Sequence, residues 1–307
     1  MSLRPVYALA LVGGLALSGC SGPELPFLQK PAAQMDGHAI AMADYDTRLK
    51  LLKDDYNTKR KQDPATYPDL NAPEGKTNLE KLENEAIREL VDQVLLVDDA
   101  GKHNINVSDD DVNKDVDNAR KDYESRAAQQ QTQGQPTPPS FNDYLKQAGV
   151  TIDQVREQAR ARLAEQRLEN SLGEKRATEA LALVKAGTDI VEVAKKYSDE
   201  KEADRGAELS VPISGLDAGS LAPVKPVLTT LNPGETNQEL TRGTDGFFIF
   251  KVTAKDAANI KVRYVFVRAP DAAFYHPDQR PQWFVDYLAE LERAAHVKYN
   301  VAHLTNP

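Results

Sequence analysis

The stretch LENEAIRELVDQVLLVDDAGKHNINVSDDDV, Leu82 to Val112, contains the strongest helical pattern of the chain. Its apolar residues recur at the three- and four-residue spacing of one buried helix face: Leu82, Ala86, Ile87, Leu90, Val91, Val94 and Leu95. Gly101 then gives a C-cap signal, residues 105–107 have strand-like composition, and Ser108 before a run of aspartates indicates the N-cap of a further helix. We therefore predict a helix at the centre of a core, followed closely by a second helix.

Helical patterns continue on both sides of this stretch. Upstream, residues 35–52 contain an Asp-Gly turn, a short strand at 38–41 and a helix start, while residues 57–77 are polar with three prolines and favour an extended loop. Downstream, residues 141–172 carry further helical spacing. The run QQQTQGQPTPPS, residues 129–140, is low in complexity and is predicted to be disordered. The N-terminal half is thus predicted to be a helical module.

Composition and charge limit the function. A chain of 307 residues with 40% hydrophobic and 28% charged content has globular composition and allows about two domains. Acidic residues outnumber basic residues by 47 to 38, so the net charge of -9 argues against a nucleic-acid partner. The chain has a single cysteine, Cys20, which excludes an intramolecular disulfide and a zinc cluster built from cysteines.

The position of Cys20 indicates its role. Arg4 precedes an apolar run from Val6 to Leu17, and LSGC ends that run with small residues before the cysteine. This segment resembles a bacterial lipoprotein signal, which implies cleavage after residue 19 and lipidation of Cys20. The alternatives are a buried cysteine after an ordinary signal peptide, or an uncleaved anchor, but residues 5–19 are short for a span of about 20 residues. Residues 20–34 are then predicted to be a flexible tether, and the protein to be extracytoplasmic, in the periplasm or on the outer face of the cytoplasmic membrane.

Three segments in order carry a wider resemblance. They are DGHAIAMADYD, then LENEAIRELVDQVLLVDDAGKHNINVSDDDV, then FNDYLKQAGVTIDQVREQARARLAEQRL. Their succession resembles the N-terminal chaperone module of the SurA/PrsA-type extracytoplasmic foldases. The resemblance implies that residues 35–172 and 271–307 pack into one helical module around an inserted domain at 173–270. The tail RPQWFVDYLAELERAAHVKYNVAHL fits the returning piece, with a helix and then an alternating strand, HVKYNV.

The inserted stretch resembles a parvulin-type peptidylprolyl isomerase domain. The segments EKRATEALALVKAGTDIVEVAKKYSDEKEADRGAELSV, LTTLNPGETNQEL and GTDGFFIFKV match the order of the helices, turns and closing strand of that domain. The closing strand of the active members bears a histidine, and Phe248 stands at that position. The resemblance also implies a pocket for the proline ring, for which Leu221, with Val224 or Val227, are the candidates.

The opening strand of a parvulin is missing before Glu174. The segment IKVRYVFVRAP, Ile260 to Pro270, resembles that strand, with Tyr264 where a second histidine stands in the family. Because the first and last strands are neighbours in the family's antiparallel sheet, a hairpin after Val252 could deliver the segment there. We predict such a permuted first strand. In the alternative, the segment begins a truncated second domain or pairs elsewhere.

The chemistry implied by the resemblance is rotation about an X-Pro bond, whose barrier is about 18–20 kcal/mol. Phe248 cannot form a hydrogen bond, whereas Tyr264 keeps a hydroxyl and Glu200 aligns with the cysteine or aspartate of the family. These three residues are therefore candidates for a vestigial catalytic site, and we expect weak or lost isomerase activity.

Cofactor and metal chemistry are not indicated. The five histidines show no H-E-x-x-H spacing, and no glycine-rich loop follows a strand. The SDDD run at Ser108 superficially suggests calcium, but it lacks the loop glycine and the terminal glutamate, so a helix cap is the better interpretation. We predict no cofactor and no metal.

The sequence thus predicts a mainly helical α+β protein in which an antiparallel parvulin-like sheet is inserted. Its predicted function is that of a membrane-anchored foldase that binds unfolded secreted or envelope proteins. An active parvulin-type isomerase and a structural envelope lipoprotein are the alternatives.

Overall fold

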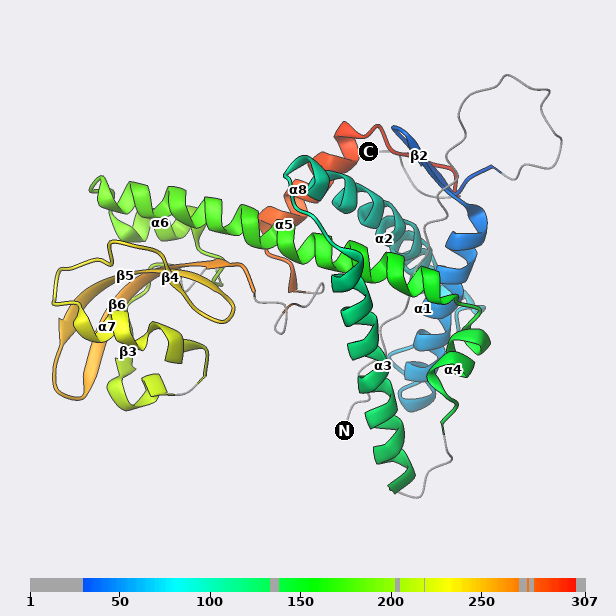
Figure 1. Ribbon diagram of the computed structural model, residues 1–307, viewed down its shortest axis with the longest axis horizontal. Coiled ribbons are helices and arrows are strands. Elements are labelled where there is room, and N and C mark those ends of the chain that lie inside the picture. Colours follow the sequence, from blue (N-terminus) through cyan, green and yellow to red (C-terminus); the bar gives the residue numbers. More distant parts are fainter. Residues whose placement is uncertain are drawn as a thin grey trace. The chain divides into compact units, whose positions relative to one another are not determined.

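The computed structural model describes residues 30–132, 138–201, 205–217, 219–270, 275 and 279–301 (Figure 1). The chain forms two compact units: unit 1 is Met1–Glu165 with Leu288–Pro307, and unit 2 is Gln166–Tyr287. The divisions fall inside two helices, α5 (Ile152–Lys185) and α8 (Gln282–Ala294). The predicted domain start at residue 173 also lies within α5. The predicted fold class, mainly helical α+β with small antiparallel sheets, is confirmed.

Unit 1 is a helical layer with a small sheet. Besides the first part of α5 and the end of α8, its elements are β1 (Ala33–Met35), β2 (His38–Ile40), α1 (Met42–Gln62), η1 (Pro73–Gly75), α2 (Lys76–Lys102), α3 (Asp109–Thr132), α4 (Phe141–Ala148) and β7 (Lys298–Tyr299). The sheet has the antiparallel order β2-β1-β7, with Ala33 opposite both Ile40 and Tyr299. A strand from the end of the chain thus completes a sheet begun at residue 33, inside the predicted tether.

Helix α2 is the centre of the unit 1 core, as predicted. Ile87, Leu90 and Val91 have no exposed surface. They belong to one hydrophobic cluster with side chains of α1, of the small sheet and of the chain end: Tyr45, Leu49, Leu52, Ile40, Val297 and Tyr299. Complete burial of an aliphatic side chain of this size stabilises a fold by about 1.5–3 kcal/mol, so α2 holds this unit together.

The end of α2 differs from the prediction. The helix continues through Gly101 to Lys102, and Asn104 takes the left-handed conformation with φ 59°. The amides of Asn104 and Ile105 donate to the carbonyls of Gly101 and Ala100 at 3.0 and 2.8 Å, which is a Schellman cap. Asparagine tolerates this conformation better than most residues with a side chain, so the cap forms without glycine. Because the cap uses Ile105, the strand predicted at 105–107 does not form.

The loops and the last strand are shorter than the sequence predicts. Residues 57–62, predicted to be loop, complete α1, where Lys59 pairs with Asp55 one turn earlier at 2.6 Å. In the run predicted to be disordered, 129–132 end α3 and 133–137 lie outside the described residues. The strand predicted in HVKYNV is limited to Lys298 and Tyr299.

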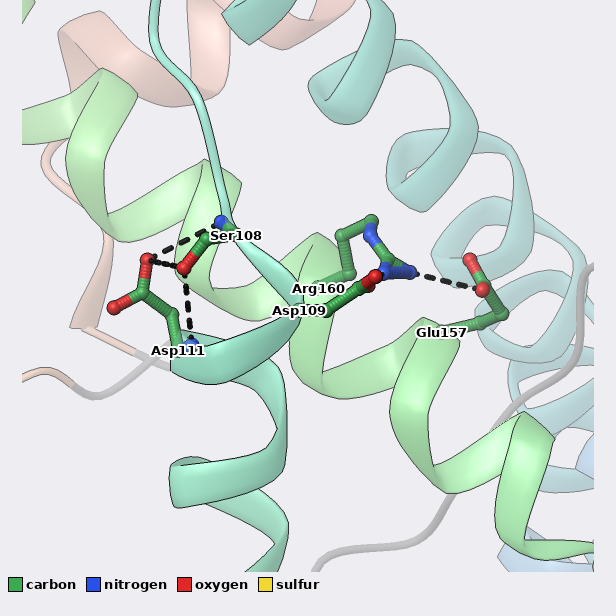
Figure 2. Close-up of polar contacts among 5 residues, drawn as sticks. All are labelled: Ser108, Asp109, Asp111, Glu157 and Arg160. Atoms are coloured by element: carbon green, nitrogen blue, oxygen red, sulfur yellow. Dashed lines mark hydrogen bonds and ion pairs between the residues drawn. The ribbon is translucent and has the colours of Figure 1, made fainter.

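The start of α3 confirms the cap predicted at Ser108 (Figure 2). Its hydroxyl oxygen accepts from the amide of Asp111 at 3.1 Å, and the hydroxyl donates to the Asp111 carboxylate at 2.8 Å. Arg160 on α5 donates to Asp109 at 2.6 Å and to Glu157 at 3.0 Å. The acids of the SDDD run thus serve the helix start and its contact with α5.

Unit 2 is a four-stranded antiparallel sheet between helices. Besides the end of α5 and the start of α8, its elements are α6 (Ile190–Tyr197), β3 (Leu209–Pro212), η3 (Ile213–Asp217), η4 (Gly219–Val224), α7 (Lys225–Thr230), β4 (Thr241–Arg242), β5 (Gly246–Lys255) and β6 (Asn259–Arg268). The strand order is β3-β6-β5-β4, and β5 and β6 form a long hairpin (Figure 1). The prediction that residues 260–267 join the sheet beside the 246–252 strand is therefore confirmed.

Candidate functional site

The two faces of the unit 2 sheet carry different side chains, because successive residues of a strand point to opposite faces. Ile249 and Val265 face the cluster made by α5 and α6. The intervening residues face the cluster made by η3, η4 and α7: Phe248, Phe250, Val252, Val262, Tyr264 and Phe266. This second face, called here the aromatic face, bears two of the predicted site residues.

Phe248 is at the centre of the aromatic face. Its ring centroid lies 4.9 Å from that of Phe266, 5.4 Å from that of Phe250 and 6.2 Å from that of Tyr264. The Phe248–Phe250 pair is stacked, and Phe248 is 7% exposed. Phe248, a predicted site residue, is thus a core side chain that stabilises the sheet through ring packing.

The structure brings Glu200 and Tyr264 together. The Tyr264 hydroxyl donates to Glu200 Oε1 at 3.2 Å, although the two residues are far apart in sequence. Arg205 donates from Nε to the Glu200 backbone carbonyl at 3.0 Å and so also holds this segment. Both side chains of the pair are partly exposed. The pair is a polar group at the edge of the aromatic face, and its carboxylate oxygens can accept hydrogen bonds from N–H groups.

Ser198 and Asp199 hold the segment that carries Glu200 against β6. The Asp199 amide donates to the Phe266 carbonyl at 2.7 Å, and the Phe266 amide donates to Ser198 Oγ at 3.1 Å. The Arg268 amide donates to Asp199 Oδ2 at 2.8 Å. Strand β3 pairs with β6 only from Asn259 to Val262. The short segment therefore supplies the hydrogen bonds that the rest of this edge of β6 needs.

Asp199 is the residue that sequence reasoning missed. Burial raises the pKa of its carboxyl, while the Arg268 amide, the Trp283 indole and the charges of Arg176 and Arg205 oppose that shift. The only local signal is a Ser-Asp pair directly after a helix, which is common at helix ends. Nothing in the sequence indicates that this aspartate meets a tryptophan on α8.

The pocket candidates do not form one lining. Val224 is fully buried in the same cluster as Phe248, with Leu216 and Leu228, so it belongs to the core. Val227 on α7 is partly exposed. Leu221 lies within η4, but its side chain is outside the described part of the chain.

Other predicted features lie elsewhere or outside the description. Cys20, His276 and His303 are outside the described residues. His38 pairs with Asp98 at 2.7 Å, and His296 contacts Asp36 at 3.0 Å. Within the described ranges, no three His, Cys, Asp or Glu side chains are grouped so as to hold a metal ion. None of the helices described there has the length and apolar character needed to cross a membrane.

Together these features define an α+β protein with a discontinuous helical unit and an antiparallel sheet unit. The family described as the SurA-like N-terminal domain matches residues 6–169. The chain therefore belongs to the family of proteins with a SurA-like N-terminal domain, which is extracytoplasmic. The domain is consistent with binding of unfolded proteins in a chaperone role. A comparison with curated proteins gave no match.

Proposed function

We propose that this chain is a lipid-anchored extracytoplasmic folding factor whose helical unit binds unfolded secreted or envelope proteins. The observation that carries this proposal is the SurA-like N-terminal domain at residues 6–169. The helical module would consist of residues 35–172 and 271–307, and it would hold exposed apolar segments of its clients. The apolar run from Val6 to Leu17, followed by two small residues and Cys20, supports an anchor on the membrane.

The anchor predicts a specific effect of Cys20→Ala. Because the thiol of Cys20 would carry the diacylglycerol, its removal should leave the protein without lipid and release it from the membrane fraction. Cells grown with a labelled fatty acid should incorporate the label into the parent and the Pro23→Ala control, but not into Cys20→Ala. Equal labelling of all three proteins would show that Cys20 is not the lipidated residue.

Residues 173–270 would be a parvulin-like domain with a permuted first strand. The strand order β3-β6-β5-β4 supports this proposal, because β6 lies next to the closing strand β5, where the family has its first strand. The Glu200–Tyr264 hydrogen bond of 3.2 Å at the edge of the aromatic face supports a binding site for proline-containing segments. Phe248 is buried and lacks polar atoms, so the hydrogen-bond network of the active members would be largely replaced.

The proposed site predicts little prolyl isomerisation. In an exchange-NMR assay on an Ala-Ala-Pro-Phe peptide, the protein should accelerate the cis-to-trans step by less than about tenfold over the spontaneous rate. Tyr264→Phe and Glu200→Gln should leave this small effect and the suppression of client aggregation unchanged, as should Gln238→Ala, an exposed control in unit 2. Reduced, carboxymethylated α-lactalbumin serves as the client for the aggregation assay.

Two outcomes favour the alternatives. A rate constant close to that of active parvulins, falling in Tyr264→Phe or Glu200→Gln but not in Gln238→Ala, would make the chain an isomerase with a rebuilt site. Absence of both isomerisation and aggregation suppression would leave a structural envelope lipoprotein.

A further inference from the structure

Trp283 reaches the segment that carries Glu200. It lies in the first turn of α8, and its indole Nε1 donates to Asp199 Oδ2 at 3.1 Å. The same carboxylate oxygen accepts from the Arg268 amide at 2.8 Å, and the Asp199 amide is bound to the Phe266 carbonyl at 2.7 Å. Asp199 is therefore held by three hydrogen bonds from two elements, and the next residue along the chain is Glu200.

Two arginines, one on α5 and one on the loop after Asp199, act on its carboxylate by their charge. On α5, the Arg176 guanidinium lies over the rings of Tyr197 and Trp283, at 4.9 and 5.9 Å from their centroids, and donates to the Lys196 carbonyl at 2.8 Å. Arg205 lies on the chain that follows Asp199, and its charge also favours the ionised carboxylate.

An ion pair joins the neighbouring strand β6 to α5. The guanidinium of Arg268 on β6 is 3.7 Å from the carboxylate of Glu169 on α5, and the Glu169 side chain is 1% exposed. Arg176 and Arg205 are thus the cations whose charges act on the Asp199 carboxylate, while the Arg268 guanidinium is paired with Glu169. The Asp199 carboxylate accepts hydrogen bonds from two uncharged donors, the Arg268 amide and the Trp283 indole. Loss of the carboxylate charge would therefore weaken the hydrogen bond from Trp283.

We propose that Asp199 is the positioning residue of the Glu200–Tyr264 site and couples that site to the seating of Trp283 at the start of α8. The inference rests on the proposed function, in which this site binds proline-containing segments. Asp199 does not need to touch the ligand. Its contacts to Phe266 and Arg268 fix the chain so that Glu200 meets Tyr264, which precedes Phe266 by two residues on the same strand.

The contribution of Asp199 to stability, and its hydrogen bond with Trp283, should change with pH in a defined direction. Burial raises the pKa of the Asp199 carboxyl above its ordinary value, so the carboxyl takes up a proton at a higher pH in the folded chain than in the unfolded chain. In that interval the folded state binds more protons, and the contribution of Asp199 to stability therefore increases as the pH falls. Protonation also removes the charge from the acceptor of the Trp283 indole, and hydrogen bonds to a neutral acceptor are weaker.

Trp283 is the only tryptophan of the chain, so its fluorescence reports this contact directly. In the purified full chain, we expect the emission to change with a midpoint above the ordinary range of an aspartate. Asp199→Asn should abolish this change, because the amide keeps an acceptor of the same shape but does not titrate in this range. Glu200→Gln is the matched control at the neighbouring position and should retain the change. An unaltered titration in Asp199→Asn would overturn the proposal.

A second arm measures binding of a fluorescein-labelled Ala-Ala-Pro-Phe peptide. Asp199→Asn and Trp283→Phe should each weaken binding by about tenfold, the effect of one well-placed hydrogen bond, whereas Asp199→Glu should restore part of the affinity. Equal affinities in Asp199→Asn and the parent would overturn the positioning role. If the parent itself does not bind, the proposed function of the site fails and the positioning role fails with it. The fluorescence titration then still shows whether Asp199 titrates against Trp283.

Discussion

Gly246→Ala should destabilise unit 2 by about 3 kcal/mol, the upper end of the usual cost of overpacking, because the added methyl group meets backbone that cannot easily move aside. A Cβ on Gly246 would lie 2.1 Å from the Val267 carbonyl oxygen and 2.9 Å from Phe266 Cε2. Gly246 begins β5, and Val267 belongs to the strand paired with it. The alanine variant must therefore separate the two strands at the open end of the hairpin, next to the aromatic face.

Two other glycines provide controls for this prediction. Gly187 has φ +95° and open space around its Cβ position, so Gly187→Ala should cost only about 1 kcal/mol from the backbone conformation. Gly101 lies in α2 with open space, and Gly101→Ala should stabilise unit 1 by about 0.5–1 kcal/mol. Urea unfolding followed by Trp283 fluorescence reports unit 2, and circular dichroism reports both units. A loss of less than about 1 kcal/mol in Gly246→Ala would show that the hairpin accommodates the methyl group.

Asn237→Ala should lower the free energy of unfolding of unit 2 by about 3 kcal/mol, because several buried polar groups lose their partner at once. Asn237 is 3% exposed. Its Oδ1 accepts from the Phe250 amide at 2.6 Å, and its Nδ2 lies 2.6 Å from the Glu239 carbonyl, 3.1 Å from Thr241 Oγ1 and 3.3 Å from the Phe248 carbonyl. One side chain thus joins the loop before β4 to the middle of β5.

Two variants, Gln238→Ala and Asn237→Asp, test whether the hydrogen bonds of Asn237 stabilise unit 2. Gln238 is exposed, and its side chain donates to the Thr236 carbonyl at 3.0 Å, so Gln238→Ala should change stability by no more than about 0.5 kcal/mol. Asn237→Asp places a carboxylate among carbonyl oxygens, which disfavours its charged form. That variant should therefore gain stability as the pH falls, and urea unfolding at several pH values would show it. Asn237→Asp with the stability of the parent at neutral pH would contradict the assigned hydrogen bonds.

The spacing of apolar residues predicted correctly those helices and strands that bury one face of a local segment. The spacing of Ile87, Leu90 and Val91 fixes one buried face of α2, and both the helix and its central position are confirmed. The apolar run of residues 246–252 and the related pattern at 260–267 predicted two neighbouring strands for the same reason. A hairpin needs only a short connection, so the sequence neighbourhood of these strands already favours their pairing.

Contacts between distant segments were less predictable. The inserted domain was predicted to start at residue 173, and this residue lies inside α5, where a Cβ on Gly173 would approach the Arg268 carbonyl oxygen to 2.8 Å. Its lack of a side chain permits the close approach of β6 and does not end the helix. The Glu200–Tyr264 pair was found only because a family pattern placed both residues at one site. No family pattern pointed to Asp199, so its contact with Trp283 could be identified only from the structure.

The small sheet of unit 1 has a consequence for the order in which this protein folds. Asn300 donates to the Pro31 carbonyl across 269 residues, and β7 pairs with β1 beside it. A secreted chain emerges with its N-terminus first, so β1 must wait for nearly the whole polypeptide before its last partner strand arrives. Until then, the core that α2 shares with Val297 and Tyr299 stays open. The closing of this long loop is therefore expected as a late, slow step of folding, during which the nascent chain itself exposes apolar surface.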